Sequence, residues 1–335
     1  MYSVPQIRST PVLTPSRAAA LAGSLLAISG AAGAAALKLC ALYPHLKDSY
    51  WISVNQGMAE QAAHYGFELK VMEAGGYTNQ ETQVGQYRKC QAWGADMVLL
   101  GSVSYQLDAR IKQGLTQLPT LAVVNEVEPN TVLATVGVSW YEMGQNLGSY
   151  INAQIPADSH IDTLLMFGPK GRGGSQFIYQ GLMDTLLPDR LNLVDQLYGG
   201  NSAAAQRQLL KDYLANNPVP QLIIGGAVSA EVAVNELRAT GESGTTQIIS
   251  TYLTHGVYRA LLRGRILMAN SDQMRLQGKM AIDAAYRWHR GEPLPTMIGP
   301  RIISLTPGHH LNLVDDSLSS PGFMPVYEVT AAPNR

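Results

Sequence analysis

The sequence predicts an α/β protein made of two doubly wound parallel-sheet lobes. Apolar, strand-like segments alternate with helix-like segments almost without interruption from Leu37 to Leu305, as in successive right-handed βαβ units. The alternation restarts near Ile161, which indicates a second set of the same kind. After a leader-like N-terminus, about 300 residues remain, which is enough for two domains.

Residues 1–36 have the plan of a secretory signal peptide. Arg8 and Arg17 precede an apolar run from Ala18 to Ala32, and small residues that offer a cleavage site follow. This run is shorter than the roughly 20 residues that a membrane span needs; an uncleaved anchor is the alternative interpretation. We therefore expect a cleaved leader, a periplasmic mature chain and no membrane insertion after cleavage.

The first half of the chain contains strand-like runs bounded by turn residues. Helix-like segments between them end at Gly66 and Gly94, as left-handed C-caps require. The predicted strands are 37–43, 67–73, 96–100, 121–124 and 135–138. The predicted helices are 50–65, 79–93, 106–116 and 141–153.

The second half repeats the pattern and then changes. The predicted strands are 161–167, 191–198, 221–225 and 247–251. The predicted helices are 177–186, 203–215, 231–238 and 255–263. A strand at 265–270, a long helix at 273–289 that is stopped by Gly291 and Pro293, and a strand at 301–305 follow. The tail after Pro307 is rich in Ser, Pro and Gly, so we expect it to cover a surface.

Composition and motifs exclude several classes of function. Charged residues are 15% of the chain and the net charge is −1, so there is no basic stripe for nucleic acid. The run from Gly168 to Ser175 is similar to a phosphate-binding loop, but Gly174 stands where Lys is required. Neither a hydrolase elbow nor a zinc-protease motif occurs. We expect no enzymatic activity, no cofactor and no metal.

Cys40 and Cys90 are the only cysteines. In an exported protein they can pair, closing a loop that the chain-entropy model values at about 4 kcal/mol. The alternative is two buried thiols, one in the first strand and one late on a helix.

The turn after the first predicted strand carries a carboxylate and two large aromatic residues, Asp48, Tyr50 and Trp51. Open α/β sheets bind ligands beyond the carboxyl ends of their strands. Two π-faces with one anion suit a small cation or a methylated ammonium. The sequence therefore predicts a small-molecule site here.

The order of elements resembles the type I periplasmic binding protein fold of the ribose-binding family. The resemblance implies a ligand between two lobes joined by three crossovers, near Val138, Asn270 and Pro295. It divides the mature chain into an N-terminal lobe, 37–138 plus 270–294, and a C-terminal lobe with tail, 139–269 plus 295–335. It also implies ligand contacts at Ser175, Tyr252 and Asp272, in addition to those at the turn after the first predicted strand.

Several motifs resemble a narrower family, the periplasmic sensors of trimethylamine N-oxide that act with a TorS-type sensor histidine kinase. They are Lys38–Pro44, Lys47–Trp51, Glu73–Tyr77, Gly137–Trp140, Gly168-Pro169, Gly173–Ser175, Ser271–Met274, Ser320–Phe323 and Pro325–Tyr327. The resemblance implies that ligand and that kinase as partner. Tyr50, Trp51, Trp140 and Tyr252 would then form a cage around the methyl groups, while Asp48 faces the positive nitrogen.

Two function classes follow. The first is a ligand sensor that acts by contact with a membrane kinase. The alternative is a periplasmic binding protein that delivers a sugar or similar solute to an ABC transporter. The fold is common to both classes. The turn after the first predicted strand, however, is more aromatic than polar, which favours a sensor of a methylated cation.

Overall fold

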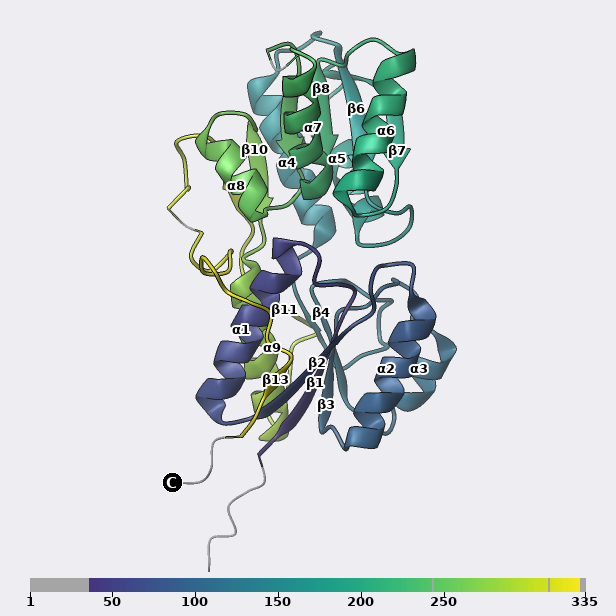
Figure 1. The fold of residues 1–335 in the computed structure, drawn as a ribbon, viewed down its shortest axis with the longest axis vertical. Helices are drawn as coiled ribbons and strands as arrows, with labels where there is room; N and C mark the ends of the chain where they lie inside the picture. Colours follow the sequence, from purple (N-terminus) through teal and green to yellow (C-terminus); the bar gives the residue numbers. More distant parts are fainter. Residues whose placement is uncertain (1–35, 243, 313, 332–335) are drawn as a thin grey trace, which may run out of the picture. The chain divides into compact units, whose positions relative to one another are not determined.

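The computed structural model describes residues 36–242, 244–312 and 314–331, so the predicted signal peptide lies outside it except for position 36. The described chain forms two α/β lobes, each built on its own sheet (Figure 1). This confirms the predicted fold class. No helix in the described ranges is long and apolar enough to cross a membrane.

The first lobe has a seven-stranded sheet in the order β11-β5-β4-β3-β1-β2-β13. Helices α1 and α9 cover one face, and α2 and α3 cover the other (Figure 1). Its strands are β1 (Lys38–Tyr43), β2 (Glu68–Glu73), β3 (Met97–Leu100), β4 (Thr120–Val123), β5 (Thr135–Val136), β11 (Met297–Ile298) and the antiparallel β13 (Glu328–Val329). Its helices are α1 (Ser49–Tyr65), α2 (Gln80–Trp93), α3 (Ala109–Gly114) and α9 (Met274–His289).

The second lobe has a six-stranded sheet in the order β12-β10-β9-β8-β6-β7. Its strands are β6 (Ile161–Phe167), β7 (Leu191–Tyr198), β8 (Leu222–Gly225), β9 (Gln247–Ser250), β10 (Met268–Ser271) and the antiparallel β12 (Ile303–Leu305). Its helices are α4 (Trp140–Gln154), α5 (Ser175–Thr185), α6 (Ala203–Asn216), α7 (Ala227–Ala239) and α8 (His255–Leu262).

Local signals explain where the helices of the first lobe begin and end. Asp48 caps α1 by accepting a hydrogen bond from the Tyr50 amide. Gly66 and Gly94 end α1 and α2 in the left-handed conformation, with φ of 70° and 71°. Both glycine caps were predicted from the sequence and are confirmed.

The crossovers divide the chain differently from the predicted domain bounds. The chain passes between the lobes after β5, β10 and β11, and the tail then makes a fourth passage, back to β2. Asn270 belongs to β10 of the second sheet, and β11 and β13 belong to the first sheet. The assignment of 270 to the N-terminal lobe, and of all of 295–335 to the C-terminal lobe, is therefore wrong. β11 and β13 have only two residues each, too few to show a periodicity, and their pairing with β5 and β2 defines them as strands.

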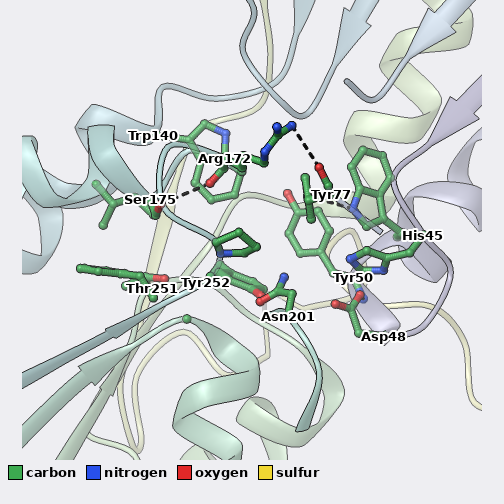
Figure 2. A pocket seen from close by; sticks show the side chains of 17 residues that line it. His45, Asp48, Tyr50, Tyr77, Trp140, Arg172, Ser175, Asn201, Thr251 and Tyr252 are labelled. Carbon is green, nitrogen blue, oxygen red and sulfur yellow. Dashed lines mark hydrogen bonds between the residues drawn. The ribbon is translucent and has the colours of Figure 1, made fainter. Parts of the chain in front are cut away.

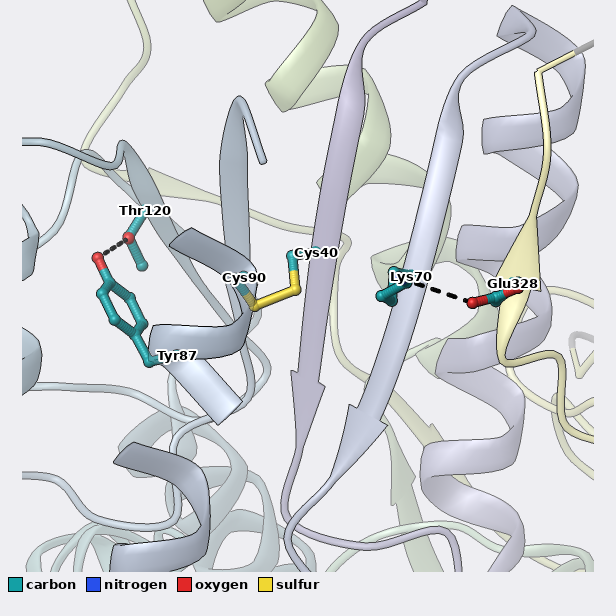
Figure 3. The surroundings of a disulfide bond; sticks show 6 residues. All are labelled: Cys40, Lys70, Tyr87, Cys90, Thr120 and Glu328. Atoms are coloured by element: carbon teal, nitrogen blue, oxygen red, sulfur yellow. Dashed lines mark hydrogen bonds and ion pairs between the residues drawn. A yellow bond between two sulfur atoms is a disulfide. The ribbon is translucent and has the colours of Figure 1, made fainter. Parts of the chain in front are cut away.

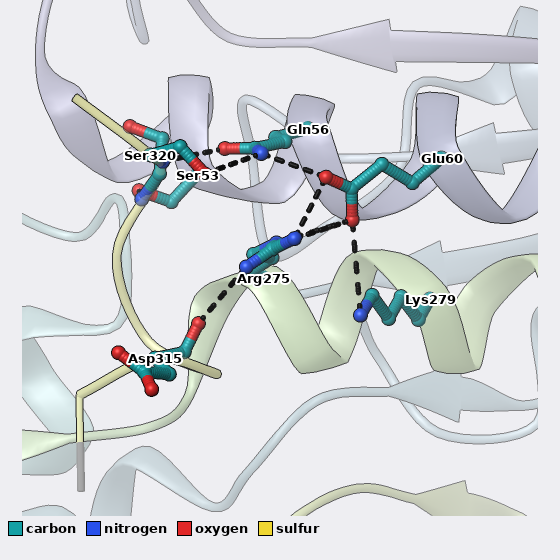
Figure 4. A network of polar contacts seen from close by, with 8 residues as sticks. Ser53, Gln56, Glu60, Arg275, Lys279, Asp315 and Ser320 are labelled. Atoms are coloured by element: carbon teal, nitrogen blue, oxygen red, sulfur yellow. Dashed lines mark hydrogen bonds and ion pairs between the residues drawn. The ribbon is translucent and has the colours of Figure 1, made fainter. Parts of the chain in front are cut away.

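The tail covers α1 and α9, as Figure 4 shows. The Ser319 and Ser320 amides donate to Ser53 Oγ and Gln56 Oε1, at 2.8 and 2.7 Å. Beneath them, Arg275 Nη2 lies 2.7 and 2.8 Å from the two Glu60 carboxylate oxygens. The tail therefore covers a surface, as expected. Polar side chains of α1 hold its backbone there through hydrogen bonds.

Cys40 of β1 and Cys90 of α2 form a disulfide (Figure 3). Both residues are fully buried. The bond joins α2 to β1, an interior strand of the first sheet, and the Tyr87 hydroxyl of α2 lies 3.2 Å from Thr120 Oγ1 of β4. At the sheet edge, Lys70 and Glu328 form a 3.8 Å ion pair between β2 and β13.

Candidate ligand-binding site

A pocket of about 40 Å³ lies between the lobes and is lined by residues of both (Figure 2). Its walls come from the turn after β1, the start of α1 and α4, and the loops after β2, β6, β7, β8 and β9. This is the crevice beyond the carboxyl ends of the strands. Six of the predicted site residues line it: Asp48, Tyr50, Trp51, Trp140, Ser175 and Tyr252.

The pocket walls are aromatic and almost entirely buried. Tyr50 of the first lobe meets Tyr252 of the second edge to face, with ring centroids 5.4 Å apart at 86°. Trp140 meets the same Tyr252 ring at 6.3 Å and 69°, and Trp51 lies 6.0 Å from Tyr50. Because these rings come from separate segments of both lobes, the complete wall exists only when the lobes are together.

Glycines make room for the two indole rings. A Cβ on Gly101 would lie 2.4 Å from Trp51, and one on Gly174 would lie 2.5 Å from Trp140. Gly174 also has a φ of 76°, which side chains rarely adopt. The Trp140 indole nitrogen donates to the Val124 carbonyl at 3.1 Å. The glycine-rich run of the second lobe therefore makes room for one wall of the pocket.

The polar groups of the pocket sit in a desolvated setting. Burial raises the pKa of Asp48, outweighing the opposing effects of His45 and of the amides of Trp51 and Tyr50. Burial lowers the pKa of the neighbouring His45. Burial also raises the pKa of Tyr252 well above its usual range, with Asp48 adding to the shift. In its ionised form the Asp48 carboxyl group can face a cation, and in its protonated form it can donate a hydrogen bond to an acceptor oxygen.

Asp272 does not line the pocket, contrary to the prediction. Its carboxylate accepts a short hydrogen bond from the Tyr50 hydroxyl and another from Gln277 Nε2 at 2.8 Å. Asp272 is 1% exposed, and burial raises its pKa. Asp272 is not the N-cap of α9 either, because Gln273 holds the cap position and makes no side-chain hydrogen bond there. Asp272 instead fixes the orientation of Tyr50 from behind the wall.

Tyr77 lines the pocket but was not among the predicted site residues. Its hydroxyl accepts hydrogen bonds from Trp51 Nε1 at 3.4 Å and Asn125 Nδ2 at 3.3 Å. Burial raises the pKa of Tyr77 to about 12. The signal was present, because Tyr77 follows Gly75-Gly76 at the end of the second predicted strand. His45, Arg172 and Asn201 also line the pocket.

Among the described residues, no group of three or more His, Cys, Asp or Glu side chains is placed to hold a metal ion. The pocket presents aromatic faces, the carboxyl group of Asp48, the guanidinium group of Arg172 and several neutral hydrogen-bonding groups. Such a lining suits a compact organic molecule with a cationic, methylated centre.

Comparison with known proteins places this geometry in a family. Residues 36–304 match the model of the periplasmic binding proteins and sugar binding domain of the LacI family. The chain is 41% identical over 293 residues to the periplasmic protein TorT of Escherichia coli K12, covering 87% of this chain and 84% of TorT.

Solved structures of related binding proteins match the fold of this chain. The structure of the TorS sensor domain–TorT complex without ligand matches with a TM-score of 0.78 and 34% identity, over 87% of this chain and all of the other. The same complex in the presence of TMAO matches with a TM-score of 0.77 and 34% identity, over 87% and 99% of the two chains. An ABC transporter solute binding protein from Bradyrhizobium sp. BTAi1 with bound bis-tris matches at 0.73 and 32% identity, over 87% and 89%. The chain therefore belongs to the periplasmic binding proteins and is a TorT-like member of that family.

Proposed function

We propose that this protein binds trimethylamine N-oxide in the interlobe pocket and regulates a TorS-type membrane sensor kinase, without catalysing a reaction. The resemblance to TorT supports the kinase as partner, because TorT is found in complex with the TorS sensor domain. The pocket itself supports the ligand. One observation carries the proposal: a small cavity walled by Tyr50, Trp51, Trp140 and Tyr252.

The cavity size favours a very small ligand. A volume of about 40 Å³ corresponds to roughly three water positions at about 10–15 Å³ each. A compact molecule of about five heavy atoms requires little further opening, whereas a pentose has about twice as many. Size and aromatic lining therefore both favour the N-oxide over a sugar.

The two ends of the ligand contact different groups of this pocket. The methyl groups, which carry the positive charge of the nitrogen, pack on the faces of the aromatic rings. The oxide oxygen needs a donor, and the hydroxyl of Tyr252, the hydroxyl of Ser175 and the amide of Asn201 all belong to the lining. With contacts to both lobes, the ligand stabilises their closed arrangement.

The affinity of the isolated protein should be modest. About five heavy atoms at roughly 1.5 kcal/mol each set a dissociation constant of a few micromolar as the tightest value. Closing the lobes weakens this affinity, and a kinase domain that prefers closed lobes strengthens it.

The test is a calorimetric titration of the mature protein with trimethylamine N-oxide at micromolar to low-millimolar concentration. Low concentration matters because this compound stabilises proteins in general through exclusion from their surface. Trp140→Ala should abolish the saturable heat, while Trp288→Ala, a tryptophan outside the pocket, should leave it intact. Saturable heat that Trp140→Ala leaves unchanged would refute the pocket as the site.

Transport is the second candidate function, because the Bradyrhizobium relative at 32% identity is an ABC transporter solute binding protein. A pentose titration run in parallel separates the two. Heat with the pentose and none with the N-oxide would replace the sensor by a transport protein. For the partner, immobilised TorS-type sensor domain should retain the protein, and retention should change when the N-oxide is added.

A further inference from the structure

Arg172 occupies an unusual loop of the second lobe, between β6 and α5. Its neighbours Gly171, Gly173 and Gly174 have positive φ values of 70°, 61° and 76°, and its amide donates to the Pro169 carbonyl at 3.1 Å. This backbone directs the side chain toward the first lobe. Figure 2 shows its guanidinium group pointing at Tyr77.

The guanidinium group joins two loops of the first lobe to the second. Arg172 Nη1 donates to the Tyr77 carbonyl at 3.1 Å and to the Val103 carbonyl at 3.2 Å. Hydrogen bonds from a charged donor are stronger than neutral ones. Beside them, the rings of Tyr105 and Phe177, again one from each lobe, have centroids 5.1 Å apart.

The contact of Arg172 with Tyr77 lies far from two of the crossovers in the order of the first sheet, and its contact with Val103 follows the middle strand, β3. The chain leaves the first lobe after β5 and β11, which are adjacent at one end of that order, whereas Tyr77 follows β2 toward the other end. A contact at this position resists opening of the lobes about the crossovers.

We propose that Arg172 is a latch that stabilises the closed arrangement of the lobes and thereby strengthens ligand binding, so that it acts as a positioning residue. Its effect on the ligand rests on the proposed function, but its effect on closure does not. Tyr77 connects the two, because its side chain lines the pocket while its carbonyl accepts from Arg172.

The expected effect follows from population shift. The apparent dissociation constant equals the intrinsic one divided by the fraction of binding-competent protein. We expect Arg172→Ala to lower the closed fraction and raise the apparent dissociation constant for trimethylamine N-oxide about tenfold. Arg172→Lys keeps a cationic donor near the carbonyls and should restore part of the affinity.

Small-angle X-ray scattering with and without trimethylamine N-oxide, joined to calorimetry, tests the latch. Arg190→Ala is the matched control, because Arg190 is also half-buried and donates to a backbone carbonyl, that of Ile155, within one lobe. Arg172→Ala should have a larger radius of gyration than Arg190→Ala in at least one of the two conditions. Circular dichroism confirms that both variants are folded.

Identical scattering of the two variants in both conditions overturns the latch. If none of the proteins binds the N-oxide but Arg172→Ala alone is more open, the latch stands and the proposed ligand fails. If Arg172→Ala and Arg190→Ala bind equally tightly and scatter differently, the latch controls closure and its proposed effect on affinity is wrong.

Discussion

Removing the Cys40–Cys90 disulfide should destabilise the first lobe much more than the second. The bonded residues are 50 positions apart. In the chain-entropy model, opening a loop of this length costs about 4 kcal/mol of folding free energy at 25 °C. Domains are typically stable by only about 5–15 kcal/mol, so the loss should be large in any unfolding experiment.

The assay is urea unfolding of the same protein with and without a phosphine reductant, followed by native-state hydrogen exchange. The reductant should shift the unfolding transition to lower urea. Amides of β1, β2 and β3 should lose protection, while those of β6, β8 and β9 should keep theirs, because the disulfide joins only elements of the first lobe.

The control is the double variant Cys40→Ala and Cys90→Ala, which should not respond to reductant. Coincident urea transitions of the natural protein in both conditions would refute the reasoning. So would alkylation of both thiols under non-reducing denaturation, because it would show that the bond is not formed.

Three further predictions concern the pocket and the residues that support its wall. Gly174→Ala introduces a Cβ 2.5 Å from Trp140 at a φ of 76°, so thermal denaturation should show a loss of about 1–3 kcal/mol; an unchanged melting temperature would mean that Trp140 moves freely. Asp48→Asn keeps a good helix cap but removes the charge, so calorimetry should show weaker N-oxide binding at unchanged stability; equal affinity would exclude a role for the charge. Burial raises the folded-state pKa of Asp272, so folding takes up a proton, and its contribution to stability falls as the pH rises from about 4 through that raised pKa. Asp272→Asn should remove this part of the pH dependence, and an identical slope of unfolding free energy against pH would refute it.

The sequence predicted the fold well because its signals are local. Alternating apolar segments and the glycines Gly66 and Gly94 define strands and helix ends from neighbouring residues alone. The rule that ligands bind beyond the carboxyl ends of strands then correctly predicted that Asp48 and Trp51 lie at the pocket. Two-residue strands such as β11 and β13 escaped prediction because their pairing, and not their own sequence, creates them.

The candidate site was predicted less completely because side-chain direction depends on distant residues. Asp272 lies at the predicted crossover, yet its carboxylate faces Tyr50, which is 222 positions away in the chain. Arg172 belongs to the glycine-rich run 168–175, but its hydrogen bonds reach loops 95 and 69 positions away in the chain. No local pattern contains these partners.

The sequence by itself determined the two-lobed architecture, the crevice that holds the pocket and the aromatic residues at its wall. Only the tertiary structure decided which side chains face the cavity, which stand behind it and which hold the lobes together. Hydrophobic periodicity is a property of each segment by itself, and it determines which face of that segment is buried. Hydrogen bonds and ring contacts between lobes form only after separate segments have been brought to the same place.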